Sequence, residues 1–90
     1  MPQRVLLPAP FRQFTNGLEA VPVNAATVKE AFDQLDNQYP GLKQKLVEAD
    51  RLRRFVNVYV DGEDIRFLNH LDSTLPDGSE ISVILAVAGG

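Results

Sequence analysis

The clearest regular pattern in the chain is an alternation of side-chain character over residues 55–60. Three valines alternate there with other residues, in the order Phe55, Val56, Asn57, Val58, Tyr59 and Val60. Because successive side chains of a β-strand point to opposite faces, this period of two predicts a strand with one buried face. A further strand is predicted from about residue 79 to residue 85, with one face made of Ile81, Val83 and Leu85.

The N-terminal part of the chain predicts an antiparallel hairpin. The apolar run of residues 4–7 indicates the first strand, and the prolines after it end the strand because proline cannot donate to a ladder. Asn16 and Gly17 tolerate positive φ and therefore predict a turn. We expect residues 18–23 to return as the second strand, and Phe11 in the predicted loop to close the edge of the core.

A helix is predicted over residues 27–39. Thr27 and Glu30 have the spacing of a capping box, and Pro40 predicts the end of the helix at about Tyr39. Apolar residues recur with helical spacing and define one buried face, formed by Val28, Ala31, Phe32 and Leu35. A short second helical turn over the core is indicated by Leu42 and Leu46.

The second half of the chain contains charged segments and turns between the predicted strands. We expect residues 48–54 to be exposed because they are mostly charged. Asp61-Gly62 predicts a tight turn, after which residues 63–67 are predicted to form a short edge strand. Pro76-Asp77-Gly78 predicts another turn directly before the last strand.

This order of elements predicts an α+β fold. A hairpin followed by a helix and further strands forms a mixed sheet of about five strands, with the main helix packed on one face. In that layout the first and last strands lie side by side in the middle. The predicted domain covers residues 1–85, and residues 86–90 form a flexible C-terminal tail.

The predicted sheet has one face that the helix leaves uncovered. The residues expected to face the helix are Val5, Leu7, Val56, Val58, Val60, Ile81, Val83 and Leu85. On the other face Leu6, Tyr59 and Ile84 form an apolar island among polar neighbours. Exposed apolar clusters mark interaction sites, so we interpret these three residues as a docking patch. The alternative is three scattered surface hydrophobes, which are normal in proteins.

Composition and charge exclude several classes of function. The chain has 90 residues, which is one small domain, and it contains no cysteine, so disulfides, thiolate metal sites and a cysteine nucleophile are excluded. A formal net charge of −3 argues against nucleic-acid binding, since such proteins are usually basic. The chain shows neither a membrane-spanning apolar run nor the apolar segment of a signal peptide, so we expect a cytoplasmic protein that is monomeric when free.

Side chains that could carry chemistry are few. His70 is the single histidine and has no second histidine or cysteine with which to bind a metal, so we expect a loop role. Asp61, Glu63 and Asp64 are expected to form a solvated turn, because acid–base catalysis needs a pocket that raises a carboxyl pKa. The sequence also lacks a phosphate-binding loop and a nucleophile elbow. We therefore do not expect an independent enzyme or a bound cofactor.

Three arginines follow one another closely in the charged segment before the alternating strand. Next to Glu48 and Asp50 in the sequence are Arg51, Arg53 and Arg54. This pattern is typical of a mixed, solvated face, and contact with an acidic partner is the alternative interpretation.

The last five residues, Ala86-Val87-Ala88-Gly89-Gly90, are the strongest functional signal. Two terminal glycines have no packing purpose, but they present an unhindered carboxylate on a segment that reaches at most about 17 Å. We predict that the α-carboxylate of Gly90 is the functional group and that Gly89 gives access to it. A frayed end or a cloning remnant is the alternative, since Gly-Gly ends about one chain in 200 by chance.

Several stretches together resemble the ubiquitin-like sulfur carriers (MoaD/ThiS-like). They are residues 54–60, residues 63–67, Pro76-Asp77-Gly78 and the Gly-Gly ending, and they look most like the carriers of a thiocarboxylate-dependent cysteine synthesis. The resemblance implies the β-grasp fold. It also implies that a partner enzyme, using its own ATP and Mg²⁺, adenylates the Gly90 carboxylate before a sulfur donor converts it to a thiocarboxylate.

The resemblance also implies contacts with two kinds of partner protein. An adenylating enzyme related to ubiquitin-activating enzymes would hold the docking patch and the tail residues Ala86, Val87 and Ala88. The sulfur acceptor would be a cysteine synthase-like enzyme, with the molybdopterin synthase large subunit, thiamine synthesis and tRNA thiolation as alternatives. Some family members need a protease to expose Gly-Gly, and we expect that the chain as printed needs none. A ubiquitin-like protein modifier and a non-covalent interaction domain remain alternatives of another class.

Overall fold

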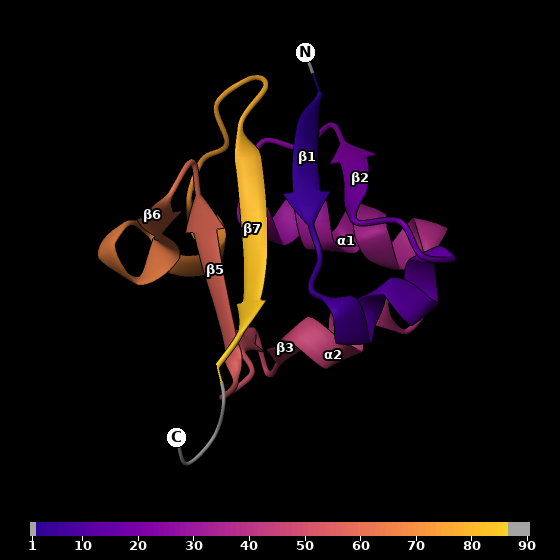
Figure 1. The fold of residues 1–90 in the computed structure, drawn as a ribbon. Coiled ribbons are helices and arrows are strands. Elements are labelled where there is room, and N and C mark those ends of the chain that lie inside the picture. The colour runs from indigo at the N-terminus through magenta and orange to yellow at the C-terminus, as the bar shows by residue number, and fades with distance from the viewer. Residues whose placement is uncertain (1, 87–90) are drawn as a thin grey trace.

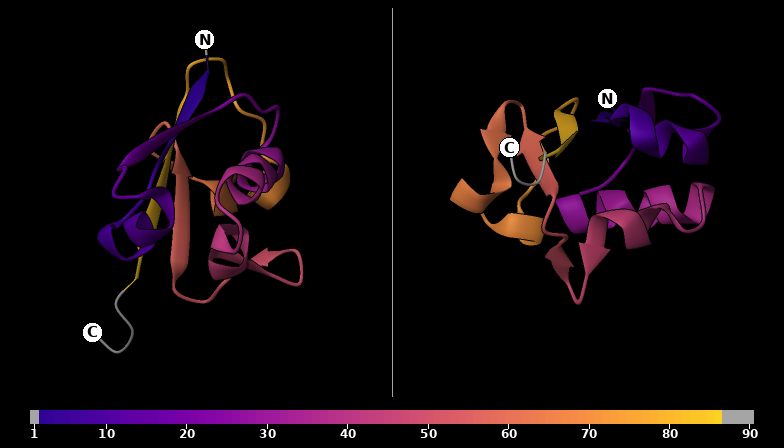
Figure 2. Two further views of the ribbon diagram at one scale, coloured as in Figure 1. Left: turned by 90° about the vertical axis from the view of Figure 1, so that its right-hand side faces the viewer. Right: turned by 60° about the horizontal axis from the view of Figure 1, so that its bottom comes forward.

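The computed structural model describes residues 2–86, and its main feature is a five-stranded sheet (Figure 1). The strands lie in the order β2 (Ala20–Val23), β1 (Gln3–Leu6), β7 (Glu80–Leu85), β5 (Val56–Val60) and β6 (Glu63–Asp64). Helices α1 (Val28–Gln38) and α2 (Leu42–Leu46) lie together on one side of this sheet (Figure 2, left). The predicted α+β arrangement of a β-grasp domain is therefore confirmed.

Two neighbouring inner strands, β1 and β7, are the first and the last strands of the sheet in sequence. β1 and β7 pair in parallel, with Val5 opposite Ile81, whereas every other pair in the sheet is antiparallel. A parallel pair needs a long crossover between its strands, and here almost the whole chain supplies it. The prediction that these two strands lie side by side is confirmed.

The connection between β1 and β2 is more regular than the sequence suggests. We predicted a loop, but the structure forms the 3-10 helix η1 (Ala9–Thr15). Phe11 is buried in the core, as predicted. Asn16 and Gly17 have φ values of 56° and 90°, which confirms the predicted turn.

The main helix begins and ends where the sequence predicts. The Glu30 N–H donates to the Thr27 hydroxyl oxygen at 3.2 Å, which caps the first turn. The Glu30 carboxylate accepts from the Ala26 N–H at 2.8 Å, one residue earlier than in the reciprocal bond of a capping box. The helix ends at its cap residue Tyr39, and its four predicted apolar residues are all fully buried.

The hairpin after β5 corrects one prediction. Asp61 and Gly62 both have positive φ, as a two-residue type I′ turn requires, but the returning strand β6 has only two residues. The chain then turns into the 3-10 helix η2 (Ile65–Phe67) in place of the predicted strand over residues 63–67. The cause is local, because the Asp64 carboxylate accepts from the Arg66 N–H at 2.9 Å and so bends the backbone.

The charged segment before β5 also has more structure than predicted. It forms a separate two-stranded hairpin of β3 (Val47–Glu48) and β4 (Arg51–Leu52), joined by Ala49 and Asp50 at positive φ. Its charged side chains are exposed, as predicted. Two-residue strands carry too little alternation for a sequence pattern to reveal them.

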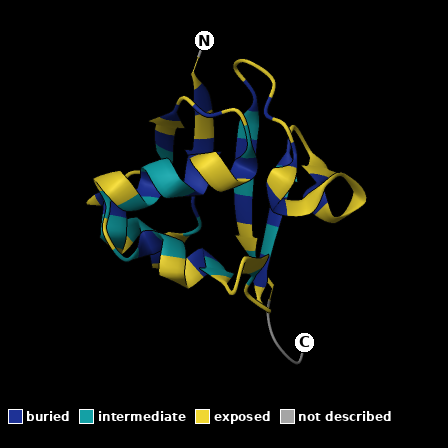
Figure 3. Ribbon diagram, turned by 180° about the vertical axis from the view of Figure 1, so that it is seen from behind, coloured by how far each residue is buried: buried dark blue, intermediate teal, exposed yellow. Residues whose placement is uncertain are grey.

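The hydrophobic core fills the space between the sheet and the helices (Figure 3). Its largest fully buried side chains include Phe32, Leu35, Leu42, Leu46 and Ile65. Of the residues predicted to face the helix, all are buried except Leu85, which is partly buried at the end of β7. Among the described residues, no helix has the length and apolar character needed to cross a membrane.

Candidate functional site

The end of β7 leads directly to the segment that carries the predicted reactive group. The Ala86 N–H donates to the Phe55 carbonyl at 2.8 Å, so the sheet still holds this exposed residue. Because β7 is the middle strand, the chain leaves the sheet at the centre of one end (Figure 1). The predicted site residues Val87, Ala88, Gly89 and Gly90 lie outside the described residues.

The outer face of the sheet, which is the face away from α1, brings together the three residues predicted as a docking patch. Leu6 on β1 and Tyr59 on β5 both lie opposite Ser82 of β7 in the ladder. Ile84 is two residues further along β7, on the same face and nearer the tail. Residues from three neighbouring strands therefore converge, and we call Leu6, Tyr59 and Ile84 the outer apolar patch.

The outer apolar patch is accessible but not uniformly so. Ile84 is 46% exposed, which is high for a large apolar side chain on a central strand. Leu6 and Tyr59 are half-buried. The patch thus offers one well-exposed aliphatic side chain beside two half-buried ones, and another protein surface can cover all three. Its role in docking remains a prediction.

Ion pairs flank the outer apolar patch. Arg4 Nη2 lies 2.9 Å from Glu80 Oε2 at the end of the face remote from the tail. Arg66 Nη2 lies 2.7 Å from Asp64 Oδ2, and Asp64 is opposite Tyr59 in the ladder. Hydrogen bonds from the Arg66 side chain and backbone lower the pKa of the Asp64 carboxyl, although its burial opposes this shift.

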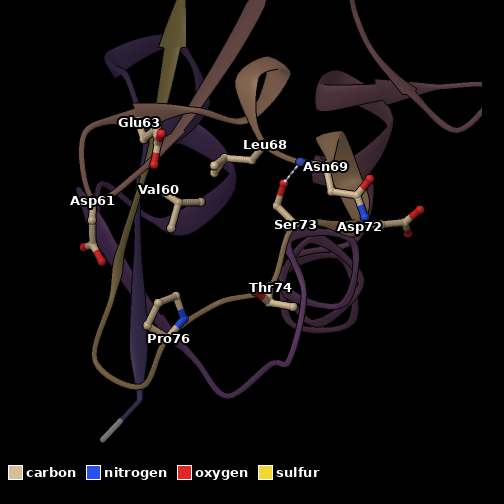
Figure 4. Close-up of a pocket in the computed structure, with 9 residues that line it drawn as sticks. All are labelled: Val60, Asp61, Glu63, Leu68, Asn69, Asp72, Ser73, Thr74 and Pro76. Atoms are coloured by element: carbon tan, nitrogen blue, oxygen red, sulfur yellow. Dashed lines mark hydrogen bonds between the residues drawn. The ribbon is translucent and has the colours of Figure 1, made fainter.

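A pocket at the end of the sheet remote from Ala86 is lined by Asp61 and Glu63, two of the three clustered acidic residues noted in the sequence, and by Asp72 (Figure 4). The carboxylates of Asp61 and Asp72 lie on opposite sides of this pocket and do not converge. Asp61 Oδ1 accepts from the Glu80 N–H at 2.9 Å, which fixes the start of β7. In residues 2–86 no three His, Asp or Glu side chains are grouped to hold a metal ion. Asp61 therefore has a structural role at the start of β7.

A second pocket, which we call the basic pocket, lies beside the tail end of the sheet. Its rim is formed by Arg51, Arg53, Arg54, Arg66 and His70. The first three were predicted to form an exposed mixed face, and their exposure is confirmed. The sequence does not reveal the pocket, because Arg66 and His70 join it only through the packing of η2 and of η3 (His70–Asp72) near β5.

Comparison with known proteins shows a similarity over nearly the whole chain. The model of the ThiS family matches residues 5–90. The sulfur carrier protein CysO of Mycobacterium tuberculosis is 34% identical over 89 residues, which cover 96% of each chain. The match therefore includes the sheet, the helices and the C-terminal residues.

Solved structures and a second relative are also similar to this chain. A chain in the crystal structure of the Amycolatopsis orientalis BexX/CysO complex superposes with a TM-score of 0.93 at 39% identity, covering 98% of this chain and 99% of that one. Small archaeal modifier protein 3 of Haloferax volcanii is 35% identical over 65 residues, which cover 72% of this chain and 71% of the relative. Both a sulfur carrier and a protein modifier are thus among the similar proteins.

Proposed function

Because the chain belongs to the ThiS family, we propose that it is a sulfur carrier protein whose reactive group is the α-carboxylate of Gly90. The observation that carries this proposal is the family match through residue 90, combined with a Gly-Gly pair that follows the middle strand of the sheet after three short residues. In this function the protein is a co-substrate that enzymes act on, and it is not itself an enzyme.

The proposed chemistry takes place on one carboxylate. An oxygen of the Gly90 carboxylate attacks the α-phosphorus of ATP on the partner enzyme, and pyrophosphate leaves as an acyl-adenylate forms. A donor that supplies sulfur at the oxidation level of sulfide then attacks the acyl carbon, and AMP leaves. Adenylation is needed because an ionised carboxylate is a poor acyl donor. The ATP and Mg²⁺ belong to the partner enzyme.

Residue choice in the tail supports this chemistry. Gly89 and Gly90 have no side chains, so their backbone can pass through a narrow channel that larger residues would block. Ala86 and Ala88 are small, and Val87 is the largest residue after β7. In the proposed complex, residues 86–88 lie in the approach to the active site of the activating enzyme.

The outer apolar patch supplies the docking surface in this proposal. Its residue Ile84 lies on the strand that leads into the tail, so an enzyme that covers Ile84 is in a position to receive Gly90. A pre-formed patch orients the tail without a large conformational change. The patch binds an adenylating enzyme related to ubiquitin-activating enzymes.

We propose cysteine synthesis as the pathway that receives the sulfur. The support is similarity to CysO proteins, one of which is described as a sulfur carrier and another of which was solved in a complex with BexX. A cysteine synthase-like enzyme is then the acceptor. Molybdopterin synthase, thiamine synthesis and tRNA thiolation remain alternative destinations for the same thiocarboxylate.

Intact-protein mass spectrometry tests the carrier function. The chain is incubated with a matched adenylating enzyme, ATP, Mg²⁺ and sulfide, and we expect a mass gain equal to one sulfur replacing one oxygen. A chain with one alanine added after Gly90 is the control, because its terminal carboxylate then belongs to alanine and no longer to the second glycine. Absence of the mass gain in the unaltered chain, with an enzyme that modifies a known carrier, would overturn the proposal.

A second candidate function is covalent modification of other proteins. Similarity to small archaeal modifier protein 3 favours it, and the same adenylated carboxylate would form an amide with a lysine of a target protein. The test is an epitope-tagged chain expressed in its host. We expect high-mass adducts that disappear when Gly89 and Gly90 are deleted, and their absence under conditions that form the thiocarboxylate would exclude the modifier function.

A further inference from the structure

We propose that the basic pocket binds an acidic, glutamate-containing segment of the protein that takes up the C-terminal tail. This inference rests on the proposed function, because it assumes a partner that acts on Gly90. The basic pocket is a contact surface separate from the outer apolar patch, and its chemistry fits an acidic partner.

The shape of the basic pocket suits a side chain with an aliphatic stem and a charged head. Its volume is about 480 Å³, and its floor consists of the apolar residues Val56, Ile65 and Leu71. Four arginines line the pocket together with this apolar floor. A glutamate side chain can place its methylene groups on such a floor while its carboxylate reaches the rim.

Two of the rim arginines are already occupied within the domain. Arg66 makes a two-pronged contact with the Asp64 carboxylate, with Nε 3.1 Å and Nη2 2.7 Å from Oδ2. Arg53 Nε donates to the Gln44 carbonyl at 2.5 Å, and its Nη1 lies 3.3 Å from Glu48 Oε2. These two side chains therefore shape the rim more than they attract a ligand.

The other two rim arginines are available to a partner. Arg51 and Arg54 are exposed and make no side-chain hydrogen bond or ion pair within residues 2–86. Asp50 is the one carboxylate of the pocket lining, so the local charge stays positive in a chain whose net charge is −3. Arginine binds carboxylates in a bidentate geometry, which gives orientation as well as affinity.

The position of the basic pocket links it to the tail. Phe55 accepts the hydrogen bond from the Ala86 N–H, and its chain neighbours Arg54 and Val56 both line the pocket. A protein that holds the residues after Ala86 therefore lies next to the pocket. Two available arginines beside an apolar floor also suit a short peptide segment, whereas nucleic acids require a longer stripe of positive charge.

The first test measures how the rate of the activating enzyme depends on the concentration of the carrier. We compare the wild type with the Arg51→Gln/Arg54→Gln double variant and with a Lys29→Gln/Lys45→Gln control, whose lysines are exposed and lie outside the basic pocket. Both variants lose two positive charges. We expect the arginine variant to raise the KM for the carrier by about threefold to tenfold with kcat unchanged, and the control to match the wild type.

Salt provides an internal check on this result. Added salt shortens the range of charge interactions from about 10 Å at 0.1 M to about 3 Å at 1 M, so the difference between wild type and arginine variant should shrink as salt rises. If the arginine variant keeps the wild-type KM at low salt while the wild type is adenylated normally, the inference fails and the carrier function stands. If the wild type is not adenylated at all, it is the carrier function that fails.

A titration without any enzyme tests the chemistry of the ligand. A blocked hexaglutamate peptide is added to ¹⁵N-labelled protein, with hexaglutamine peptide, inorganic phosphate and AMP as separate comparisons. We expect amide shift changes around Arg51, Arg54 and Leu71 with hexaglutamate only, and none in the arginine variant. Equal responses to phosphate or AMP would show a general anion site and overturn the assignment to an acidic protein segment.

Discussion

Val83 and Ile84 are neighbours on β7 and have similar chemistry, but the sheet gives them opposite roles. Val83 points toward α1 and is 4% exposed, whereas Ile84 points to the outer face and is 46% exposed. The difference arises only from the period of two along a strand. A single strand can therefore stabilise the fold with one set of side chains and expose the other set, which here forms part of the proposed docking surface.

The two faces of the sheet also differ in the charged residues that they carry. The inner face contains no charged residue among its buried side chains, and it packs against the apolar side of α1. The outer face carries the Arg4–Glu80 pair and the Asp64–Arg66 pair beside the outer apolar patch. Burial thus selects for uncharged side chains on the inner face, where the buried amide of Gln3 pairs with the Ala25 backbone. The outer face instead combines apolar contact with charged groups, as protein interfaces do.

The largest expected effect comes from placing a charge on the inner face. In Val83→Asp the new carboxylate has no partner in the apolar core, and such burial costs more than about 4 kcal/mol. Because small domains have about 5–15 kcal/mol of stability, we expect loss of most or all of the folded state. Urea denaturation followed by circular dichroism measures this, and a variant with wild-type stability would show that the faces of β7 are assigned wrongly.

The same substitution one residue later should spare the fold. We expect Ile84→Asp to change the free energy of unfolding by less than about 1 kcal/mol, because the side chain remains in water. It should raise the KM of the activating enzyme for the carrier about tenfold, which corresponds to about 1.4 kcal/mol of lost contact.

Leu18 provides a matched control for this experiment. It is 48% exposed, close to the value for Ile84, but it precedes β2 and lies outside the outer apolar patch. Leu18→Asp should leave both the stability and the KM near their wild-type values. If Leu18→Asp and Ile84→Asp raise the KM equally, the effect is one of net charge and the docking role of the patch is wrong.

The inner face could be predicted from the sequence almost completely, and the reason is its periodicity. The valines of β5 and the apolar residues of α1 repeat with the periods of a strand and a helix, and burial enforces these periods. The β3–β4 hairpin and the end of β6 could not be predicted in this way. They depend on the hydrogen bond that the Arg66 N–H donates to the Asp64 carboxylate and on backbone turns at Ala49 and Asp50, which leave no periodic trace.

The site could be predicted from the sequence only in part. The grouping of Leu6, Tyr59 and Ile84 follows from strand register, and the sequence was sufficient to place all three on one face. The basic pocket joins Arg54 to Arg66, which are on different segments with no shared period. Contacts of that kind depend on how short 3-10 helices pack, and local sequence patterns do not determine such packing.

A smaller effect on stability than that of Val83→Asp is expected at Asp64, which is the one buried carboxylate among residues 2–86 and lies beside the outer face. Asp64 is 7% exposed and accepts hydrogen bonds from both the side chain and the backbone of Arg66, so Asp64→Asn should cost about 1–2 kcal/mol near neutral pH. The folded state lowers the pKa of this carboxyl below the value of about 3.9 in an unfolded chain. Its ionised form therefore stabilises the fold above about pH 4, and this contribution is lost as the pH falls through the lower pKa of the folded state.

Urea denaturation of the wild type and Asp64→Asn between neutral pH and pH 2 measures this contribution directly. We expect the difference in unfolding free energy between the two proteins to be largest near neutral pH and to shrink below about pH 4, as the wild-type carboxyl becomes protonated. Glu63→Gln is the control, because Glu63 is the exposed neighbour in the same short strand and should show no comparable pH-dependent difference. If the difference for Asp64→Asn is the same at pH 2 as at pH 7, the contact with Arg66 acts through shape and neutral hydrogen bonds, and charge on the outer face contributes nothing to the fold.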